Sequence, residues 1–533
     1  MKKNSLIKSL SVSGVILAFI FTLSFSFSQA KAINNAKEEN SVQTPSENVI
    51  KKDDGFTIIT VNDESALSGA YRKENRKFAA MATVEVTENR TWTAWMSGGD
   101  KEPHKDNYII VAYSDDCGDT WVDPYMIIDD TSDGRMRDPV FWYAPTGELY
   151  LFFGGRSGTR LIKFTNPDGD INKISYSEVT SPFFGTILNK PIVTTKGEWL
   201  CSADPYDEKS NYSKEYVYVS VDEGNSWTLR GTITSKAEDK KYHEGTIIEK
   251  NDGNLCVLSR IESGKGGGVE RAYSSDDGKT WTTFEANLNK PLIGPGSKCC
   301  IYKLKNKALL FVSNDSTSAR IDLTAYYSED DGLSWRSLLL DSRTGDSAYP
   351  DVTQDKNGNI YVIWDHSRSV KCEIRMARFT VDDLKEGAFI GENSKRPCVT
   401  KRHGYNDIVN VNTPYNRTMQ LNKGDSVSKE DIICSLPTAI SVTLDDGSKK
   451  AVVGKWTTNW FSTDYAGTYR FEFTPQTENN LQDMGDYFVV RVKVTEKEEN
   501  KGGGCSSSFN GNTFLFLTAG AILVIAKRSK KRI

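Results

Sequence analysis

The stretch Ser274-Ser275-Asp276-Asp277-Gly278-Lys279-Thr280-Trp281 has the pattern S-x-D-x-G-x-x-W, and this pattern decides the fold. It recurs at residues 114–121, 220–227 and 328–335. The last three copies start 54 residues apart, and the first lies about two such steps earlier. Asp and Gly suit a tight turn, because Asp bonds nearby backbone donors and Gly accepts a positive φ. We therefore expect a repeated hairpin turn pinned by its Trp, with a degenerate copy near residues 166–169.

A second series alternates with these turns. In each unit a turn is followed by an apolar strand, and the units begin at Arg90, Gly147, Gly197, Gly253, Lys307 and Gly358. Repeats of about 50 residues have room for four short strands, which make one propeller blade. The sequence therefore predicts an all-β chain whose residues 56–392 form a six-bladed β-propeller. The turns should lie at equivalent positions on the blade periphery, where their role is structural.

The pattern changes after the last repeat. Residues 393–414 read as a polar linker, and residues 415–497 as a small β-sandwich with alternating strands near 439–444, 467–473 and 487–494. The Asp445-Asp446-Gly447 turn and the segment 466–469 resemble bacterial Ig-like surface domains. Such modules are usually spacers, and a carbohydrate-binding role is the alternative.

Both ends of the chain carry targeting signals. Lys2, Lys3 and Lys8 precede an apolar run, and Ala30-Lys31-Ala32 offers a cleavage site, so residues 1–32 read as a signal peptide. An uncleaved N-terminal anchor is the alternative. Residues 498–512 form a Gly/Ser spacer, and residues 513–533 a hydrophobic anchor with a basic tail. Processing at Cys505 is the other interpretation of this end. We expect a secreted protein anchored at the bacterial cell surface or membrane.

The composition limits the classes of binding partner that we expect. The formal net charge is −4, which indicates no basic face for nucleic acid. The nine cysteines show no regular framework, so no disulfide is predicted. With four histidines, a histidine-rich metal site is not expected, and no cofactor motif is present. We expect a monomer whose partner is a glycan.

The number and spacing of the S-x-D-x-G-x-x-W turns resemble the exo-sialidase family, with its Asp-box (BNR) repeats. The resemblance implies cleavage of a sugar that carries a carboxylate on its anomeric carbon. A carboxylate nucleophile would be repelled by that charge, so the family uses tyrosine. A neutral phenol needs a base, which a glutamate supplies. Arginines hold the sugar carboxylate through their planar forks.

Four residues match the family's site in order and spacing. Glu244 opens a strand in the run 243–253, and Arg260 closes the next strand. Arg320 precedes a strand that leads into the last Asp box. Ser347-Ala348-Tyr349-Pro350-Asp351 resembles the family's A-Y-S-D segment. The resemblance implies Tyr349 as nucleophile, Glu244 as its base, and Arg260 and Arg320 as carboxylate ligands. Tyr349 and Glu244 should meet within hydrogen-bond distance.

Two stretches depart from the family's pattern. The family's first arginine lies in F-R-I-P, but residues 78–81 here read Phe-Ala-Ala-Met. Arg76 is the nearest substitute, and Arg135 and Arg137 are further ones. The family's general acid lies in the loop before the first box, where Glu102 is at about the right distance. Asp100 and Asp106 are the alternatives, and any of the three can instead be a solvated loop charge.

Other segments resemble a divergent sialidase-like branch, whose members need not cut sialic acid. They are residues 189–191, 349–351 and 373–379. We therefore expect a surface exo-glycosidase of the sialidase type, with sialic acid as the first candidate sugar. The alternatives are a glycosidase for another sugar, a non-catalytic carbohydrate-binding or adhesive propeller, and a structural scaffold.

Overall fold

The computed structural model describes residues 48–496, except 54, 131–135, 156–157, 206–213, 236–240, 263–267, 287–290, 343–344, 459, 477–480 and 483–487. The predicted signal peptide (1–32), spacer (498–512) and C-terminal anchor (513–533) lie outside the described residues. Among the residues that are described, no helix is long and apolar enough to cross a membrane.

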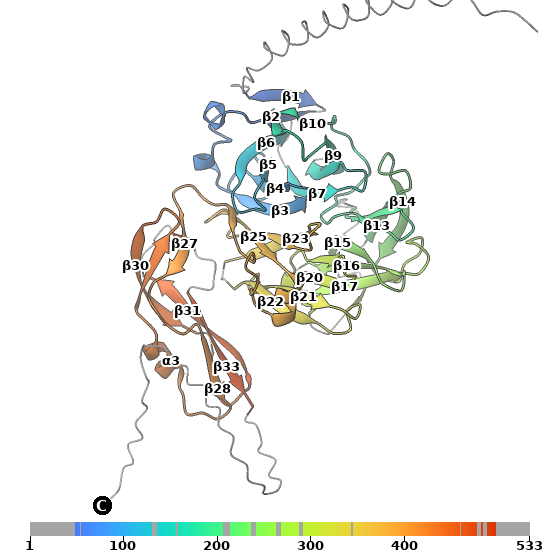
Figure 1. The fold of residues 1–533 in the computed structure, drawn as a ribbon. Helices are drawn as coiled ribbons and strands as arrows, with labels where there is room; N and C mark the ends of the chain where they lie inside the picture. Colours follow the sequence, from blue (N-terminus) through green and yellow to red (C-terminus); the bar gives the residue numbers. More distant parts are fainter. Residues whose placement is uncertain are drawn as a thin grey trace, which may run out of the picture.

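Six antiparallel sheets follow one another along the described chain from residue 49 to residue 400, each built from consecutive strands (Figure 1). The first sheet contains β1 (Val49–Asp53), β2 (Phe56–Thr60), β3 (Ala79–Val86), β4 (Thr91–Ser97), β5 (Tyr108–Ser114) and β6 (Val122–Asp130). The second contains β7 (Arg137–Tyr143), β8 (Leu149–Gly155), β9 (Gly158–Thr165) and β10 (Ser175–Tyr176). The third contains β11 (Ile192–Val193), β12 (Trp199–Ala203), β13 (Lys214–Ser220) and β14 (Thr228–Thr234).

The remaining three sheets repeat the same order of strands. The fourth contains β15 (Tyr242–Glu249), β16 (Leu255–Ile261), β17 (Val269–Ser274) and β18 (Glu285–Ala286). The fifth contains β19 (Cys300–Lys303), β20 (Leu309–Asn314), β21 (Leu323–Ser328) and β22 (Arg336–Asp341). The sixth contains β23 (Ser347–Gln354), β24 (Ile360–His366), β25 (Glu373–Phe379) and β26 (Cys398–Thr400).

The sheets pack face to face in a closed ring. A buried apolar cluster lies between each pair of neighbours. The ring closes where Trp95 and Ile110 of the first sheet pack with Ile363 and Met376 of the sixth. Strands β4 and β24 are buried along their whole length, because both faces of each sheet are covered. The all-β class is thus confirmed, and the closed ring is consistent with a β-propeller.

The four predicted turns occupy equivalent places. Each joins the third and fourth strands of a sheet, not counting the extra pair β1–β2 in the first sheet. In the copy at 274–281, Gly278 donates its N–H to Ser274 Oγ at 2.9 Å, and Trp281 Nε1 donates to the Gly278 carbonyl, also at 2.9 Å. The segment 166–169 joins β9 and β10 in the same way. The turn therefore closes on its own residues, as its sequence predicts.

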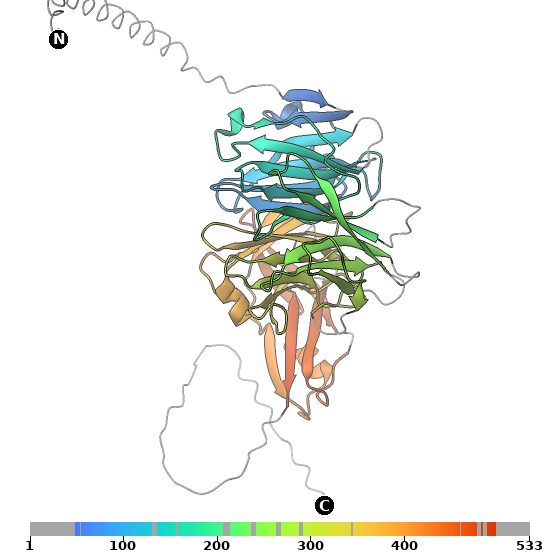
Figure 2. The same ribbon diagram turned by 90° about the vertical axis from the view of Figure 1, so that its right-hand side faces the viewer.

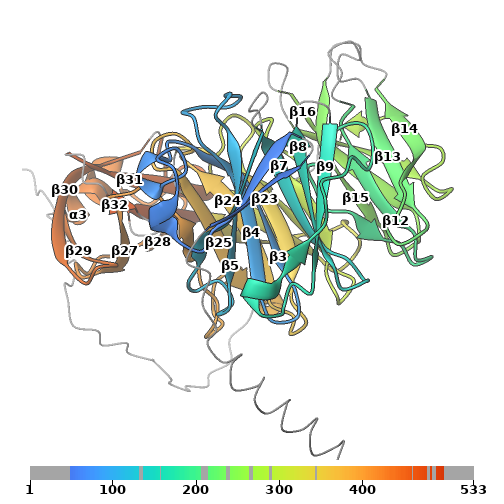
Figure 3. The ribbon, with the colours of Figure 1, turned by 90° about the horizontal axis from the view of Figure 1, so that it is seen from above.

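The C-terminal domain lies beside the ring (Figures 1 and 3) and extends away from it (Figure 2). Its strands are β27 (Asn406–Val411), β28 (Thr418–Asn422), β29 (Ala439–Leu444), β30 (Lys449–Thr457), β31 (Gly467–Pro475), β32 (Leu481–Gln482) and β33 (Val489–Thr495). Strand β30 pairs with β29 over its first half and with β31 over its second, so the strands enclose one core. Arg375 of β25 joins this domain to the ring through Asp407, 2.9 Å away.

Helices are short in the described residues. They are α2 (Val381–Glu386), α3 (Lys429–Ser435) and the 3-10 turns Glu64–Ala66, Lys73–Asn75 and Ile171–Lys173. Both α-helices begin with a capping box, formed by Thr380 with Asp383 and by Ser428 with Asp431.

Two predicted boundaries were wrong. The first sheet begins at Val49, before residue 56, because β1 and β2 extend its outer edge. The predicted linker 393–414 contains β26, which belongs to the sixth sheet, and β27, which belongs to the C-terminal domain. Strands β26 and β27 have only three and six residues, so their pairing with other strands places them rather than a long apolar pattern of their own.

Candidate functional site

The side chains of Tyr349 and Glu244 meet inside the ring. The Tyr349 hydroxyl donates a hydrogen bond to Glu244 Oε1 at 2.6 Å, and both residues are 5% exposed. Tyr349 comes from β23 and Glu244 from β15, the first strands of the sixth and fourth sheets. The predicted contact is therefore present, and it shows that the first strands are the innermost ones.

A β-bulge aims each of these side chains. The register shifts between His243 and Thr246 in β15 and between Ala348 and Asp351 in β23. At the bulges Glu244 has φ +61° and Tyr349 has φ +56°. L-residues adopt this left-handed conformation at a cost of about 1–2 kcal/mol, so the surrounding structure must hold it. A bulge re-aims the side chain that it carries.

Side chains from β13 of the third sheet and from the segments before β11 and after β12 hold the Glu244 bulge. Asp204 accepts the Glu244 N–H at 2.9 Å. Asn189 donates to the carbonyls of Glu244 and Gly245, at 3.0 and 3.2 Å. Glu215 accepts the Gly245 N–H at 3.1 Å. The backbone that carries Glu244 is therefore fixed from both sides of the peptide.

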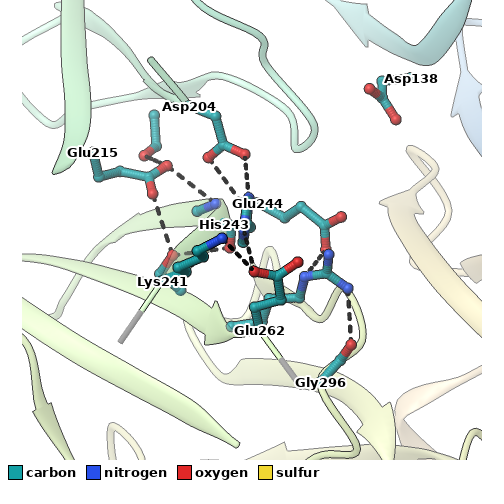
Figure 4. A network of polar contacts seen from close by, with 12 residues as sticks. Asp138, Asp204, Glu215, Lys241, His243, Glu244, Glu262 and Gly296 are labelled. Atoms are coloured by element: carbon teal, nitrogen blue, oxygen red, sulfur yellow. Dashed lines mark hydrogen bonds and ion pairs between the residues drawn. The ribbon is translucent and has the colours of Figure 1, made fainter. Parts of the chain in front are cut away.

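These carboxylates form the polar network of Figure 4. Burial, followed by the charge of Asp204, raises the pKa of Glu215 well above its ordinary value. His243 lies between Asp204 and Glu262, with ring nitrogens 3.7 and 3.8 Å from their oxygens. Gly245 is required here, because a Cβ at this position would stand 2.2 Å from Glu215 Oε1.

Arg260 lies in the site but is already paired. Its Nε is 2.9 Å from Glu244 Oε2, and its Nη1 donates to the Gly296 carbonyl at 2.8 Å. The guanidinium carbon stands 6.0 Å from the centre of the Tyr349 ring. In this geometry Arg260 orients the carboxylate of Glu244, so its charge is largely taken up within the protein.

Arg320 is placed differently. Its guanidinium carbon lies 5.5 Å from the Tyr349 ring centre. To the residues that the structure describes, its side chain makes no ion pair or hydrogen bond. Of the two predicted carboxylate ligands, Arg320 is thus the one whose side chain has no protein partner among the described residues.

Arg368 was missed by the sequence analysis. It follows β24, and its guanidinium carbon lies 4.3 Å from the centre of the Tyr349 ring. Its Nε and Nη2 donate to the two carboxylate oxygens of Asp365, at 2.9 and 3.1 Å. Its Nη1 donates to Glu102 Oε2 at 3.3 Å. No motif surrounds Arg368 in the sequence, so only the folded ring shows that it belongs to the site.

The loop carboxylates separate into two groups. Glu102 reaches the site through Arg368, although 28% of its side chain remains exposed. Burial raises the pKa of Glu102, the charge of Arg368 opposes this, and Glu244 adds to it. Asp100 and Asp106 instead line a surface cavity of about 730 Å³ beside Tyr108. Glu102 is therefore the one of the three that the fold brings towards Tyr349.

The three substitute arginines also differ. Arg76 is buried in an ion pair with Asp123, with its Nη1 2.7 Å from the carboxylate. This ion pair neutralises the charge of Arg76. The structure therefore gives no support to the expectation that Arg76 contacts a bound sugar. Arg137 stands at the start of β7, 3.7 Å from Asp138, and its charge acts on Glu102. Arg135 lies outside the described residues.

Asp138 is a second residue that the sequence analysis missed. It sits on a bulge of β7 with φ +50°, the same conformation as Glu244 and Tyr349. Burial raises the pKa of Asp138 to about 7, against the opposing charge of Arg137 and together with the charge of Glu102. Figure 4 shows Asp138 apart from the Asp204–His243 network.

One side of Tyr349 is apolar. Tyr349 and Ala348 belong to a buried cluster with Phe78, Ala80, Met81 and Met96 of the first sheet. This is the stretch where the family pattern has an arginine and the present sequence has none. These side chains form an apolar wall beside Tyr349, in the stretch that lacks the family's first arginine.

A large cavity, of about 860 Å³, opens at the opposite ends of the first strands. Its lining includes Thr87, Tyr143, Thr195, Lys250 and Gln354, and none of the predicted catalytic residues. Among the described residues, no group of three or more His, Cys, Asp or Glu side chains is placed to hold a metal ion.

Solved structures with a similar fold come from several sources. A protein of unknown function from Dyadobacter fermentans shares 16% identity over 56% of this chain and 93% of its own, with a TM-score of 0.46. The Hadza microbial sialidase Hz136 shares 21% over 54% of this chain and 64% of its own, with a TM-score of 0.43. The NanB sialidase from Streptococcus pneumoniae shares 13% over 60% of this chain and 70% of its own, with a TM-score of 0.46. These values are too low to indicate an activity or a substrate.

The family comparison is more decisive. The BNR repeat-like domain matches residues 89–362, more than half of the chain. The match includes Glu244, Arg260, Arg320 and Tyr349, and it confirms the BNR repeats that the sequence pattern predicts. The chain belongs to the family of proteins with a BNR repeat-like domain.

Proposed function

We propose that this protein is a glycoside hydrolase that releases a terminal acidic sugar, sialic acid foremost, with Tyr349 as its nucleophile. The observation that carries the proposal is the buried contact of 2.6 Å between the Tyr349 hydroxyl and Glu244 Oε1. Here the partner is a carboxylate from a different sheet, and both residues stand on strained bulges, which is typical of functional sites.

The chemistry runs in two displacements. In the first, Tyr349 Oη attacks the anomeric carbon while its proton passes to Glu244, and Glu102 protonates the departing glycosidic oxygen. In the second, Glu102 takes a proton from water, the water oxygen attacks the same carbon, and Tyr349 leaves and recovers its proton from Glu244. Two inversions give net retention of the anomeric configuration.

Electrostatics supports a tyrosine in this role. Burial, followed by the charge of Glu244, raises the pKa of the Tyr349 hydroxyl well above its ordinary value. Free phenolate is therefore scarce, and the proton must leave during the attack rather than before it. The Glu244 carboxylate, oriented by Arg260 at 2.9 Å, stands where it can accept that proton.

Arg320 is the proposed ligand for the sugar carboxylate, because its guanidinium lies above Tyr349 without a protein partner among the described residues.

A second candidate function follows from the apolar wall. Met81 and Met96 beside Tyr349 favour a glycosidase for a sugar with less negative charge. The two candidates share the nucleophile and differ only in what the wall and Arg320 contact.

A substrate screen tests the proposal. The purified protein is assayed with chromogenic glycosides of sialic acid and of neutral and uronic sugars, and the first-formed anomer is identified by NMR. Hydrolysis with retention is the expected result. Release of the inverted anomer would contradict the tyrosine mechanism. Glycan binding without hydrolysis would favour the adhesive alternative.

We also propose the setting in which the site works. The six sheets are interpreted as the blades of a propeller, and the C-terminal domain as an Ig-like spacer. The sequence of the two ends supports export and attachment at the bacterial surface through residues 513–533. Protease treatment of intact cells tests this, since a surface protein is cleaved and an internal one is protected. Sedimentation of the purified protein tests the expected monomer.

A further inference from the structure

We infer that Arg368 is the positioning residue of this site, because one guanidinium joins the proposed nucleophile Tyr349 to the proposed acid Glu102. The inference rests on the proposed function and extends it to a residue without a counterpart in the sequence pattern. Arg368 follows β24 of the sixth sheet, whereas Glu102 lies in a loop of the first. The contact therefore exists only because the ring closes between these two sheets.

Asp365 makes Arg368 rigid. It accepts two hydrogen bonds from the guanidinium, at 2.9 and 3.1 Å, and its side chain is fully buried. Asp365 Oδ2 also accepts the Met81 N–H at 2.8 Å, so the carboxylate is fixed to the backbone of the first sheet. A bidentate pair of this kind sets the plane of the guanidinium as well as its place.

The rigid guanidinium lies closer to the Tyr349 ring than the other two arginines do. The distances to the ring centre are 4.3 Å for Arg368, 5.5 Å for Arg320 and 6.0 Å for Arg260. A cation over an aromatic face is attracted to its π electrons. The attraction grows as the phenolic proton leaves and negative charge builds on the ring, so Arg368 favours the state in which Tyr349 attacks.

The same guanidinium fixes Glu102 at 3.3 Å. Four charged groups act on this carboxyl: Arg368 and Arg137 favour its ionised form, and Glu244 and Asp365 disfavour it. Of these four groups, Arg368 is the one that contacts the Glu102 carboxyl directly, and its Nε and Nη2 are already bonded to Asp365. Arg368 therefore sets both the position of Glu102 and the pH at which it loses its proton.

The experiment compares Arg368→Met, which removes the charge, with Arg368→Lys, which keeps it. Arg230→Met is the matched control. Arg230 is also 14% exposed, and it also pairs with one carboxylate, that of Glu198, through two nitrogens at 2.8 and 3.3 Å. It lies on β14 of the third sheet. Folding of each full-length variant is checked by circular dichroism.

Two quantities are measured in each variant. One is the pH profile of kcat/KM on the best substrate. The other is the pH titration of the Glu102 carboxyl by ¹³C NMR, assigned as the resonance that Glu102→Gln lacks. A residue that only stabilises the fold would lower activity without moving either titration.

We expect Arg368→Met to lower kcat/KM at its optimum by about 10- to 100-fold. The alkaline limb of the profile and the Glu102 titration should both move to higher pH, since the lost cation favoured the carboxylate. Arg368→Lys should keep both close to those of the parent, and Arg230→Met should match the parent throughout. A Glu102 titration unchanged in a folded Arg368→Met variant would overturn the inference. If the parent hydrolyses no glycan, the proposed function fails, and the NMR titration still decides the role of Arg368.

Discussion

The bulges on β3 and β15 have nearly the same backbone conformation, but the side chains that they carry differ in chemistry. Met81 on β3 has φ +57°, and Glu244 on β15 has φ +61°. Each donates its N–H to a carboxylate at the end of the second strand of the preceding sheet, Asp365 at 2.8 Å and Asp204 at 2.9 Å. One bulge presents a thioether to Tyr349, and the other presents a carboxylate.

This difference indicates that the fold sets the position of a bulge side chain, whereas the type of residue at the bulge sets its chemistry. Asp138 on β7 and Tyr349 on β23 occupy bulges of the same kind, so four first strands aim four side chains by one backbone device. The two carboxylic acids and the phenol can exchange protons, whereas the methionine cannot. Substitutions at the bulges should therefore change reactivity far more than they change the fold.

The largest effect is expected for Tyr349→Phe. The change removes the attacking oxygen and leaves the ring in its apolar cluster, so kcat should fall by roughly 10³-fold or more. Tyr327→Phe is the control, because Tyr327 is a buried tyrosine that also donates to a carboxylate, Glu329 at 3.0 Å. Steady-state kinetics with circular dichroism measures both. Equal rates for Tyr349→Phe and the parent would rule out the tyrosine mechanism.

Glu244→Gln should come next. Glutamine fills the same space but cannot accept the phenolic proton, so kcat should fall by roughly 10²- to 10⁴-fold. Met81→Leu changes the corresponding bulge with an apolar residue of similar volume, and it should keep most of the activity. Parallel measurements of kcat and Tm compare the two bulges. A loss of kcat as large in Met81→Leu as in Glu244→Gln would break the distinction between them.

A smaller and selective effect is expected for Arg320→Lys. The lysine keeps the charge but loses the planar fork, so kcat/KM for acidic sugars should fall by roughly tenfold, the equivalent of about 1.4 kcal/mol. Activity on neutral sugars should change little. The measurement is the ratio of kcat/KM for a matched acidic and neutral pair. An unchanged ratio would mean that Arg320 does not bind the sugar carboxylate.

The smallest effect concerns stability rather than rate. The pKa of Asp138 is raised from 3.8 to about 7 in the folded protein, so the folded state keeps a proton that the unfolded chain loses above about pH 4. Stability from this group is present at low pH and is lost as the pH rises to about 7. Asp138→Asn removes that dependence, so its Tm relative to the parent should rise between pH 4 and 7. A constant Tm difference across this range would contradict the assignment.

Local patterns explain what could be predicted. The S-x-D-x-G-x-x-W turns are closed by hydrogen bonds within eight residues, such as that from Gly278 N–H to Ser274 Oγ. Their structure therefore follows from the local sequence. Tyr349 and Glu244 were found because each lies in a short motif whose order along the chain is preserved.

The sequence by itself determined the all-β class and the repeated turns, because both depend on residue types at short spacing. The pairing of Tyr349 with Glu244, which stand 105 residues apart, was implied by the resemblance to the exo-sialidase family. Only the tertiary structure decided that Arg368 contacts Glu102 beside Tyr349, that Asp138 stands on a bulge like those of Glu244 and Tyr349, that Arg76 is neutralised by Asp123, and that β26 belongs to the sixth sheet. The physical reason is ring closure. It brings Arg368 to Glu102 across 266 residues of chain, and no local pattern carries information over that separation.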